Sequence, residues 1–135
     1  MIERALWVTT DLFEASTPGP DFINPRCFGE DFARWLMTRL AQRSLDASEP
    51  IQEDFGWVIL IKAAPHTFTL SIGIMDETIG QVPAQWRIGL AYEKALNSVT
   101  SWFKRAPTAA LQSIFEELQS IVRSEPGFIV SMDEP

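Results

Sequence analysis

The sequence predicts a single-domain α+β fold, a two-layer sandwich in which helices pack on one face of a mostly antiparallel sheet. Three observations lead to this fold class. Several stretches alternate apolar and polar residues with a period of two, as strands with one buried side do. Other stretches repeat apolar residues at helical spacing. The predicted strands follow one another directly in the middle of the chain, with predicted helices before and after them.

The length of the chain, 135 residues, fits one domain over residues 1–135. Hydrophobic residues make up 46% of the sequence, and a chain of this size buries about two-thirds of its unfolded surface. We therefore expect a folded domain with a core of its own rather than a disordered chain.

The first two predicted elements are a strand and a helix, separated by a long loop. Residues 2–14 alternate between apolar and polar side chains, which predicts a strand. Residues 15–27 contain three prolines and a glycine, which predicts a loop. Residues 28–43 have apolar side chains at helical spacing, and Glu30 and Asp31 lie in the first turn, where the helix dipole favours negative charge.

Three strands are predicted in the middle of the chain. Residues 44–56 carry four acids and no base, and we expect them to form a loop. Residues 57–63 are apolar on both sides, which favours a central strand. Residues 68–75 and 85–92 alternate, so each is expected to turn one side toward the core.

The last third of the chain is predicted to be helical. Apolar spacing indicates one helix over residues 96–105 and a second that begins at residue 109 and ends before Pro126. Residues 128–132 form a last short strand. The predicted order of elements is therefore β-α-β-β-β-α-α-β.

The net charge, the apolar runs, the N-terminal residues and the cysteine count together argue against several classes of protein. The formal net charge is −7, from 18 acids and 11 bases, which argues against nucleic-acid binding because phosphate contacts need a basic surface. The longest apolar run, residues 57–61, is far shorter than the roughly 20 residues that span a bilayer. The N-terminal residues lack the pattern of a signal peptide, and a single cysteine fits a reducing compartment, so we expect a cytoplasmic protein without a membrane segment.

The common catalytic motifs are missing from the sequence. It contains no phosphate-binding loop, dinucleotide fingerprint, HExxH, CxxC or GxSxG. With one cysteine and one histidine, a structural zinc site is not expected either. The sequence thus predicts no catalytic residues, no metal and no cofactor, and it favours a protein that is not an enzyme.

Cys27 and His66 form the one enzymatic alternative. The predicted topology places Cys27, just before the first helix, and His66, in the turn after the second strand, at the same end of the sheet. A thiol near a helix N-terminus can have a lowered pKa, and a histidine can act as its base. Free cysteines more often behave as small buried hydrophobes, so we expect Cys27 to be structural.

Two pairs of acids, Glu30 with Asp31 and Glu53 with Asp54, are the other candidates for chemistry. A helix of about sixteen residues is roughly 24 Å long and is expected to hold the two pairs at opposite ends of the sheet, which excludes a four-carboxylate site. We expect the Asp54 carboxylate to accept backbone N–H groups in the turn before the second strand. In the alternative interpretation, Glu49, Glu53 and Asp54 form an acidic recognition surface for a cationic partner.

The side of the sheet that helices leave open carries a second set of candidates. Trp7 lies on the otherwise polar side of the first strand, and with Phe13 it is expected to cover the open side of the sheet or to meet a partner. Arg87 lies on the corresponding side of residues 85–92. Small residues share that side on two adjacent strands, and they either floor a shallow groove or let a loop lie close: Ser71, Gly73, Gly89 and Ala91.

Two motifs resemble segments of a family of small uncharacterised bacterial proteins. The stretch FINPRCFGEDFARWL, residues 22–36, is similar to the Cys-Phe-Gly-Glu-Asp…Trp-Leu stretch of that family, and EDFGWVILI, residues 53–61, is similar to its Glu-Asp-Trp-Gly-Trp motif. Phe55 stands where the family has the first tryptophan. The resemblance covers roughly residues 20–90; it implies a bacterial origin and a stand-alone domain, and it carries no activity or site residue with it.

For function, the sequence favours a non-enzymatic binding protein, such as an immunity-type or chaperone-like partner of a basic protein. Its expected binding residues are Trp7, Glu49, Glu53, Asp54 and Arg87. Two alternatives stay open: a small-ligand sensor that uses the open sheet face, and a thiol enzyme that uses the single cysteine and histidine. The oligomeric state is also open, with a homodimer as one option.

Overall fold

The computed structural model describes residues 2–93 and 107–135, and it confirms the α+β fold class. The described part of the chain forms one seven-stranded sheet and two α-helices. In chain order the elements are β1 (Ile2–Thr10), α1 (Glu30–Gln42), β2 (Asp46–Ala47), β3 (Ile51–Glu53), β4 (Gly56–Ala63), β5 (His66–Ile74), the 3-10 turn η1 (Asp76–Thr78), β6 (Ala84–Tyr92), α2 (Thr108–Arg123) and β7 (Ile129–Ser131). The predicted helix over residues 96–105 lies outside the described residues.

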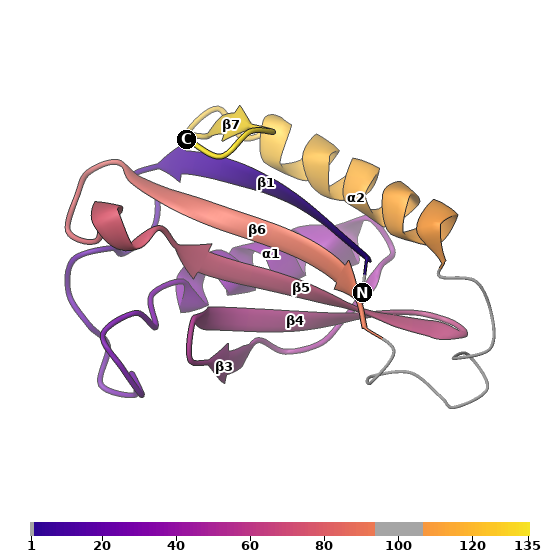
Figure 1. Cartoon of the computed structure of the whole chain (residues 1–135), viewed down its shortest axis with the longest axis horizontal. Coiled ribbons are helices and arrows are strands. Elements are labelled where there is room, and N and C mark those ends of the chain that lie inside the picture. Colours follow the sequence, from indigo (N-terminus) through magenta and orange to yellow (C-terminus); the bar gives the residue numbers. More distant parts are fainter. Residues whose placement is uncertain (1, 94–106) are drawn as a thin grey trace.

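The strands pair in the order β2-β4-β5-β6-β1-β7, and β3 pairs with β4 beside β2 (Figure 1). Every pair is antiparallel. β1 and β6 are paired along their whole length, from Ile2 opposite Tyr92 to Thr10 opposite Ala84. β7 covers only a short part of the other side of β1, opposite Trp7–Thr9. The longest pairings therefore lie in the centre of the sheet and the shortest at its edges.

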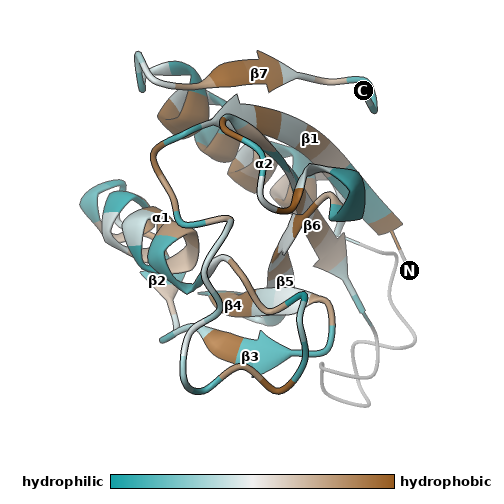
Figure 2. Ribbon diagram, turned by 90° about the vertical axis from the view of Figure 1, so that its left-hand side faces the viewer, coloured by the Kyte–Doolittle hydropathy of each residue, from teal (hydrophilic) through white to brown (hydrophobic). Residues whose placement is uncertain are grey.

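Both helices contribute to a single core on one face of the sheet. α1 packs on β4 and β2, and α2 packs on β1 and β6 (Figures 1 and 2). The predicted inward residues of β5 and β6 are all buried in this core: Phe68, Leu70, Ile72, Ile74, Trp86, Ile88, Leu90 and Tyr92. In Figure 2 the outer side of α1 is hydrophilic, as its amphipathic pattern predicts.

An aromatic cluster joins α1 to the sheet. The ring of Phe32 in α1 stacks on Phe13 with centroids 4.3 Å apart, and its centroid is 5.5 Å from those of Trp86 and Phe128. The expectation that Phe13 covers the open side of the sheet with Trp7 was therefore wrong. After β1 ends, the chain turns toward the helices, and the core offers Phe13 partners that the open face lacks.

The stretch between α1 and β4 is not a simple loop. β2 pairs with the end of β4, where Asp46 lies opposite Lys62, and β3 pairs with its start, where Glu53 lies opposite Gly56. β4 is consequently one strand in from the edge rather than central. Strands of two or three residues are too short to show a periodic pattern. For this reason the acids in this stretch were interpreted from the sequence as belonging to a loop.

Gly56 begins β4 in a conformation that a side chain cannot share. Its φ is 149°, and a Cβ at this position would lie 2.3 Å from the main-chain oxygen of Ile72 on β5. Gly80 also has a positive φ, 84°, but nothing lies within 4 Å of the position of its Cβ. A side chain at Gly80 would therefore meet backbone strain alone, whereas one at Gly56 would meet both backbone strain and a steric clash.

We predict that Gly56→Ala lowers the free energy of unfolding by more than about 2 kcal/mol, because strain and a backbone clash add. The matched change Gly80→Ala is expected to cost about 1 kcal/mol, from strain alone. Urea denaturation curves of the two variants measure both values. Equal losses in the two variants would contradict the close approach of β4 and β5 at this position.

Candidate functional site

The face of the sheet opposite the helices carries a groove made of two adjoining hollows. The larger one, the acidic hollow, has a volume of about 480 Å³. Three carboxylates line it, those of Glu3, Glu53 and Glu93, and no lysine or arginine among residues 2–93 and 107–135 does. Its remaining lining is mostly apolar or small: Ile51, Phe55, Val58, Leu60, Thr69, Ser71 and Ala91.

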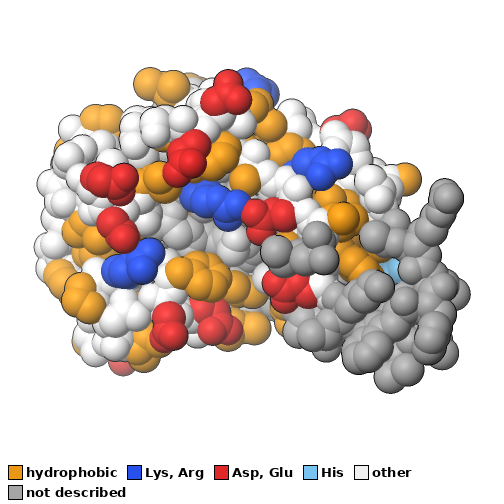
Figure 3. All heavy atoms as spheres, in the orientation of Figure 1, with side chains coloured by type: hydrophobic (Ala, Val, Ile, Leu, Met, Phe, Trp, Pro, Cys, Tyr) orange, Lys and Arg blue, Asp and Glu red, His pale blue; other side chains and the backbone are white. Residues whose placement is uncertain are grey.

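The smaller one, the basic hollow, has a volume of about 300 Å³ and is lined by Arg26 and Arg87 together with Asp76 and Glu77. Phe55 and Ser71 line both hollows, so the two adjoin at these residues. Figure 3 shows this face, where hydrophobic side chains and side chains of both charges surround a depression with a largely white floor.

Of the small residues that the sequence indicated, three line the groove, namely Ser71, Gly73 and Ala91, and both interpretations of such residues hold. Over Gly73, the main-chain oxygen of Phe55 lies 3.3 Å from where a Cβ would stand, so a turn does lie close to the sheet. Over Gly89, Nη1 of Arg87 lies 2.7 Å from the corresponding position. A larger side chain at either glycine would fill the groove or displace these neighbours.

Arg87 and Trp7 both lie on this face, as the sequence predicted. They lie opposite each other in the register of β1 and β6, and the guanidinium carbon is 6.0 Å from the centroid of the indole ring. Arg87 also donates through Nη2 to the carboxylate of Glu3 and forms an ion pair with it. Nε1 of Trp7 is buried and has no hydrogen-bond partner among the described residues.

The second apolar side of β4 forms a wall of the acidic hollow. Val58 and Leu60 line it, and Ile51 and Phe55 beside them keep 42% and 40% of their surface exposed. The apolar pattern on both sides of β4 was interpreted as central burial, but one of its two sides faces this hollow. Oγ1 of Thr69 on the neighbouring strand is buried without a partner in the part of the chain that the structure describes.

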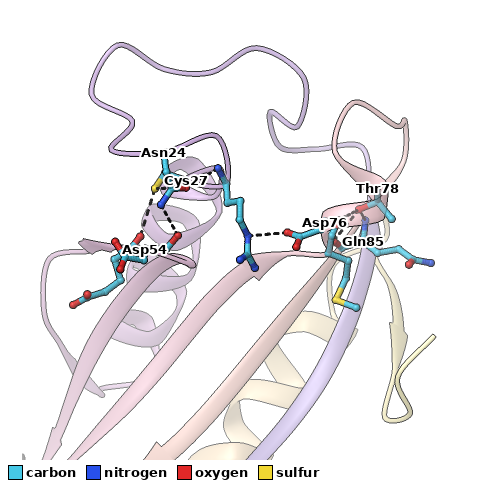
Figure 4. Close-up of polar contacts among 9 residues, drawn as sticks. Asn24, Cys27, Asp54, Asp76, Thr78 and Gln85 are labelled. Atoms are coloured by element: carbon cyan, nitrogen blue, oxygen red, sulfur yellow. Dashed lines mark hydrogen bonds and ion pairs between the residues drawn. The ribbon is translucent and has the colours of Figure 1, made fainter.

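The turn between β3 and β4 is held by the long loop after β1 (Figure 4). Asn24 donates through Nδ2 to the main-chain oxygen of Asp54 over 2.8 Å, and its Oδ1 accepts from the backbone N–H of Arg26. The expectation for the Asp54 carboxylate was therefore wrong. The main-chain oxygen of Asp54, and not its carboxylate, accepts the hydrogen bond at this turn. Arg26 continues the connection to η1 through its ion pair with Asp76, at 2.8 Å.

Cys27 is fully buried beside the same turn. Its Sγ lies 3.4 Å from the main-chain oxygen of Glu53, and Nε1 of Trp57 donates to the main-chain oxygen of Cys27 over 2.9 Å. His66 pairs with Ala63 at the far end of β4, about 23 Å away at the usual rise per residue. The prediction that Cys27 and His66 lie at the same end of the sheet was wrong. β2 and β3 lead the chain back beside β4 to the end where α1 begins, so β4 starts near Cys27 and ends near His66. No thiol–imidazole pair forms.

That return of the chain also brings the start of α1 to the same end of the sheet as Glu53 and Asp54. The geometric reason for excluding a four-carboxylate site was therefore wrong. Even so, no group of three or more His, Cys, Asp or Glu side chains within residues 2–93 and 107–135 is arranged to hold a metal ion.

Glu49 does not join Glu53 at the groove. It accepts a hydrogen bond of 2.9 Å from Arg34 on α1, and Glu30 accepts another from the same guanidinium. Both hydrogen bonds raise the pKa of Arg34 above its ordinary value, and the bond to Glu49 has the larger effect. The predicted acidic surface is thus divided between the helix side and the groove.

A further hollow of about 320 Å³ opens where the long loop crosses the start of α1. Phe22 and Phe28 line it together with Glu14 and Asp31. The backbone N–H of Thr17 donates to Glu14 and lowers the pKa of that carboxyl below its ordinary value. Asp31 accepts from the backbone N–H of Glu14, so these acids serve to close the loop onto the helix.

Sequence reasoning missed several residues that line the groove. Glu3 shares the parity of Trp7 along β1, and this signal could have assigned it to the open face. Phe55 and Arg26 belong to a turn and a loop whose positions depend on tertiary contacts, and no periodicity in the sequence marks them.

No family model, no curated protein and no solved structure matches this chain. The resemblance to small bacterial proteins stays a prediction. Within the described residues, no helix has the length and apolar character needed to cross a membrane.

We predict that Asn24→Ala lowers the free energy of unfolding by about 1 kcal/mol, because the variant loses the hydrogen bond that joins the loop to the β3–β4 turn. Asp54→Ala keeps the main-chain oxygen and is expected to stay within about 0.5 kcal/mol of the parent. Thermal and urea unfolding measure both. A larger loss in Asp54→Ala than in Asn24→Ala would show that the carboxylate closes the turn after all.

Proposed function

We propose that this chain is a non-enzymatic binding protein, of the immunity or chaperone kind, whose groove takes up an extended segment of a basic partner protein. The observation that carries this proposal is the acidic hollow. It combines an apolar wall with three carboxylates, and no base from the described part of the chain lines it. This combination suits the side chain of a lysine or an arginine, which is apolar along its stem and charged at its tip.

Each part of that side chain has a counterpart in the hollow. The methylene stem can pack on Phe55 and Leu60, and the charged tip can reach Glu53 at the rim. Glu53 forms no ion pair with another described residue, so its carboxylate is available. A hydrogen bond to a charged group contributes about 1.5–3 kcal/mol.

The charge of the whole chain supports the same partner. A net charge of −7 attracts a basic protein over a distance and raises the rate of association. Cys27 is buried and is the only cysteine in the sequence, which suits a reducing compartment and supports a cytoplasmic location. A thiol enzyme is not proposed, because Cys27 and His66 lie at opposite ends of β4.

Selection from a random dodecapeptide display library tests this function. We expect the parent protein to enrich peptides that contain lysine or arginine, and Glu53→Lys to enrich them at least about 10-fold less, because it replaces attraction with repulsion at the rim. Glu116→Lys is the matched control, since Glu116 is an exposed acid on α2. Enrichment of peptides without basic residues, or equal enrichment by Glu53→Lys and Glu116→Lys, would contradict the proposed function.

A further inference from the structure

The ion pair of Arg87 with Glu3 lies across the boundary between the two hollows. Arg87 lines the basic hollow, and Glu3 lines the acidic one. Glu3 lies opposite Ala91 in the register of the sheet, four residues along β6 from Arg87, which is about 13 Å of strand. The two side chains bridge this distance, and Nη1 of Arg87 lies over Gly89, 2.7 Å from the position of a Cβ. The arginine thus reaches along its own strand to an acid of the other hollow.

Because of this ion pair, Glu3 is not available to a partner. Nη2 of Arg87 already binds its carboxylate, and Glu93 is not free either. Within the described residues, Glu53 is the acid of this hollow that forms no ion pair. A lysine of the partner that reached Glu3 would have to displace Arg87, so one exposed ion pair would replace another. Exposed ion pairs contribute little, and such an exchange therefore adds little to binding.

Glu3 and Glu53 are too far apart to bind the same cation. They lie on β1 and β3, and the strands β6, β5 and β4 run between them (Figure 1). Neighbouring strands are about 4.8 Å apart, so four steps across the sheet amount to about 19 Å. A lysine beside Glu53 leaves Glu3 untouched, and a contact with Glu3 needs a second basic residue.

From this arrangement we infer that Arg87 determines how many basic residues of the partner the groove binds. By holding Glu3, it restricts the partner segment to one such contact, the one at Glu53. This inference rests on the proposed function, because it concerns the specificity of the same groove. Arg87 acts as an internal competitor, since its own positive charge takes the place of a second lysine of the partner. Removing Arg87 while keeping Glu3 turns a groove for one lysine into a groove for two.

Fluorescence anisotropy with two fluorescein-labelled peptides tests the inference. TKTKTKTKT carries lysines on alternate positions, so that all of them can point toward the sheet, and TTTTKTTTT carries a single lysine. We expect Arg87→Gln to bind the polylysine peptide about 10-fold more tightly than the parent protein does, because a second charge-assisted contact forms on a segment that is already held. The single-lysine peptide should bind both proteins within about 3-fold, because its cation reaches only Glu53.

Two further variants distinguish the ion pair from the charge of the whole chain. Arg43→Gln is the matched control, because it also removes one positive charge and frees one acid, Glu117, but on the helix side. It should bind the polylysine peptide within about 3-fold of the parent protein. Adding Glu3→Gln to Arg87→Gln should likewise return the affinity to within about 3-fold of the parent, because the released acid is gone. Urea denaturation curves establish that each variant is folded.

The outcomes separate this inference from the proposed function. The inference is overturned if Arg87→Gln gains no more affinity for the polylysine peptide than Arg43→Gln does, if the gain persists after Glu3→Gln is added, or if the single-lysine peptide gains as much. Each of these results leaves the proposed function standing when the parent protein still requires lysine. Equal affinity of the parent for TKTKTKTKT and TQTQTQTQT overturns the proposed function itself. The absence of binding by every peptide at millimolar concentration overturns both.

Discussion

The packing of Phe32 between Phe13 and Trp86 fixes the position of α1 on the sheet, and the groove on the opposite face depends on that position. Aromatic pairs of this kind contribute about 0.5–1.5 kcal/mol beyond the area they bury. With α1 held there, Gly29 lies against Trp86, and the residues before it extend along the start of β4. Asn24 then reaches the β3–β4 turn, and the turn carries Phe55 over the sheet. A contact in the core thus determines the shape of a surface groove.

Because the core lies on only one face of the sheet, the two sides of each strand have different roles. Alternate residues of β5 and β6 fill the core with large side chains, and the residues between them are small or polar on the other face. The open face can stay accessible because Ser71, Gly73 and Gly89 leave space instead of apolar bulk. Where one strand, β4, is apolar on both sides, the second side lies beside acidic residues. This proximity of apolar and charged surface distinguishes the groove from an ordinary solvent-exposed face.

The fold class and the core were predictable because they depend on periodicity, and periodicity is local. The same parity assigned Trp7 and Arg87 to one face. The remaining features of the site depend on contacts between distant residues. β2 and β3 are too short to form a sequence pattern. Their pairing with β4 brings the start of β4, rather than its end, to the start of α1, so Cys27 and His66 were wrongly placed together. Asp54 was assigned its contact by residue type, whereas Asn24, 30 positions earlier, binds its main chain.

The short strands at the two edges of the sheet have a consequence for the behaviour of the protein at high concentration. Edge strands with long rows of free backbone N–H and C=O groups recruit strands from other molecules and initiate aggregation. Here β2, β3 and β7 have only two or three residues each, and the part of β1 beyond β7 carries the charged side chains of Glu3 and Arg4. Intermolecular strand addition therefore has little template to extend at these edges, although the sheet exposes an apolar groove on its open face.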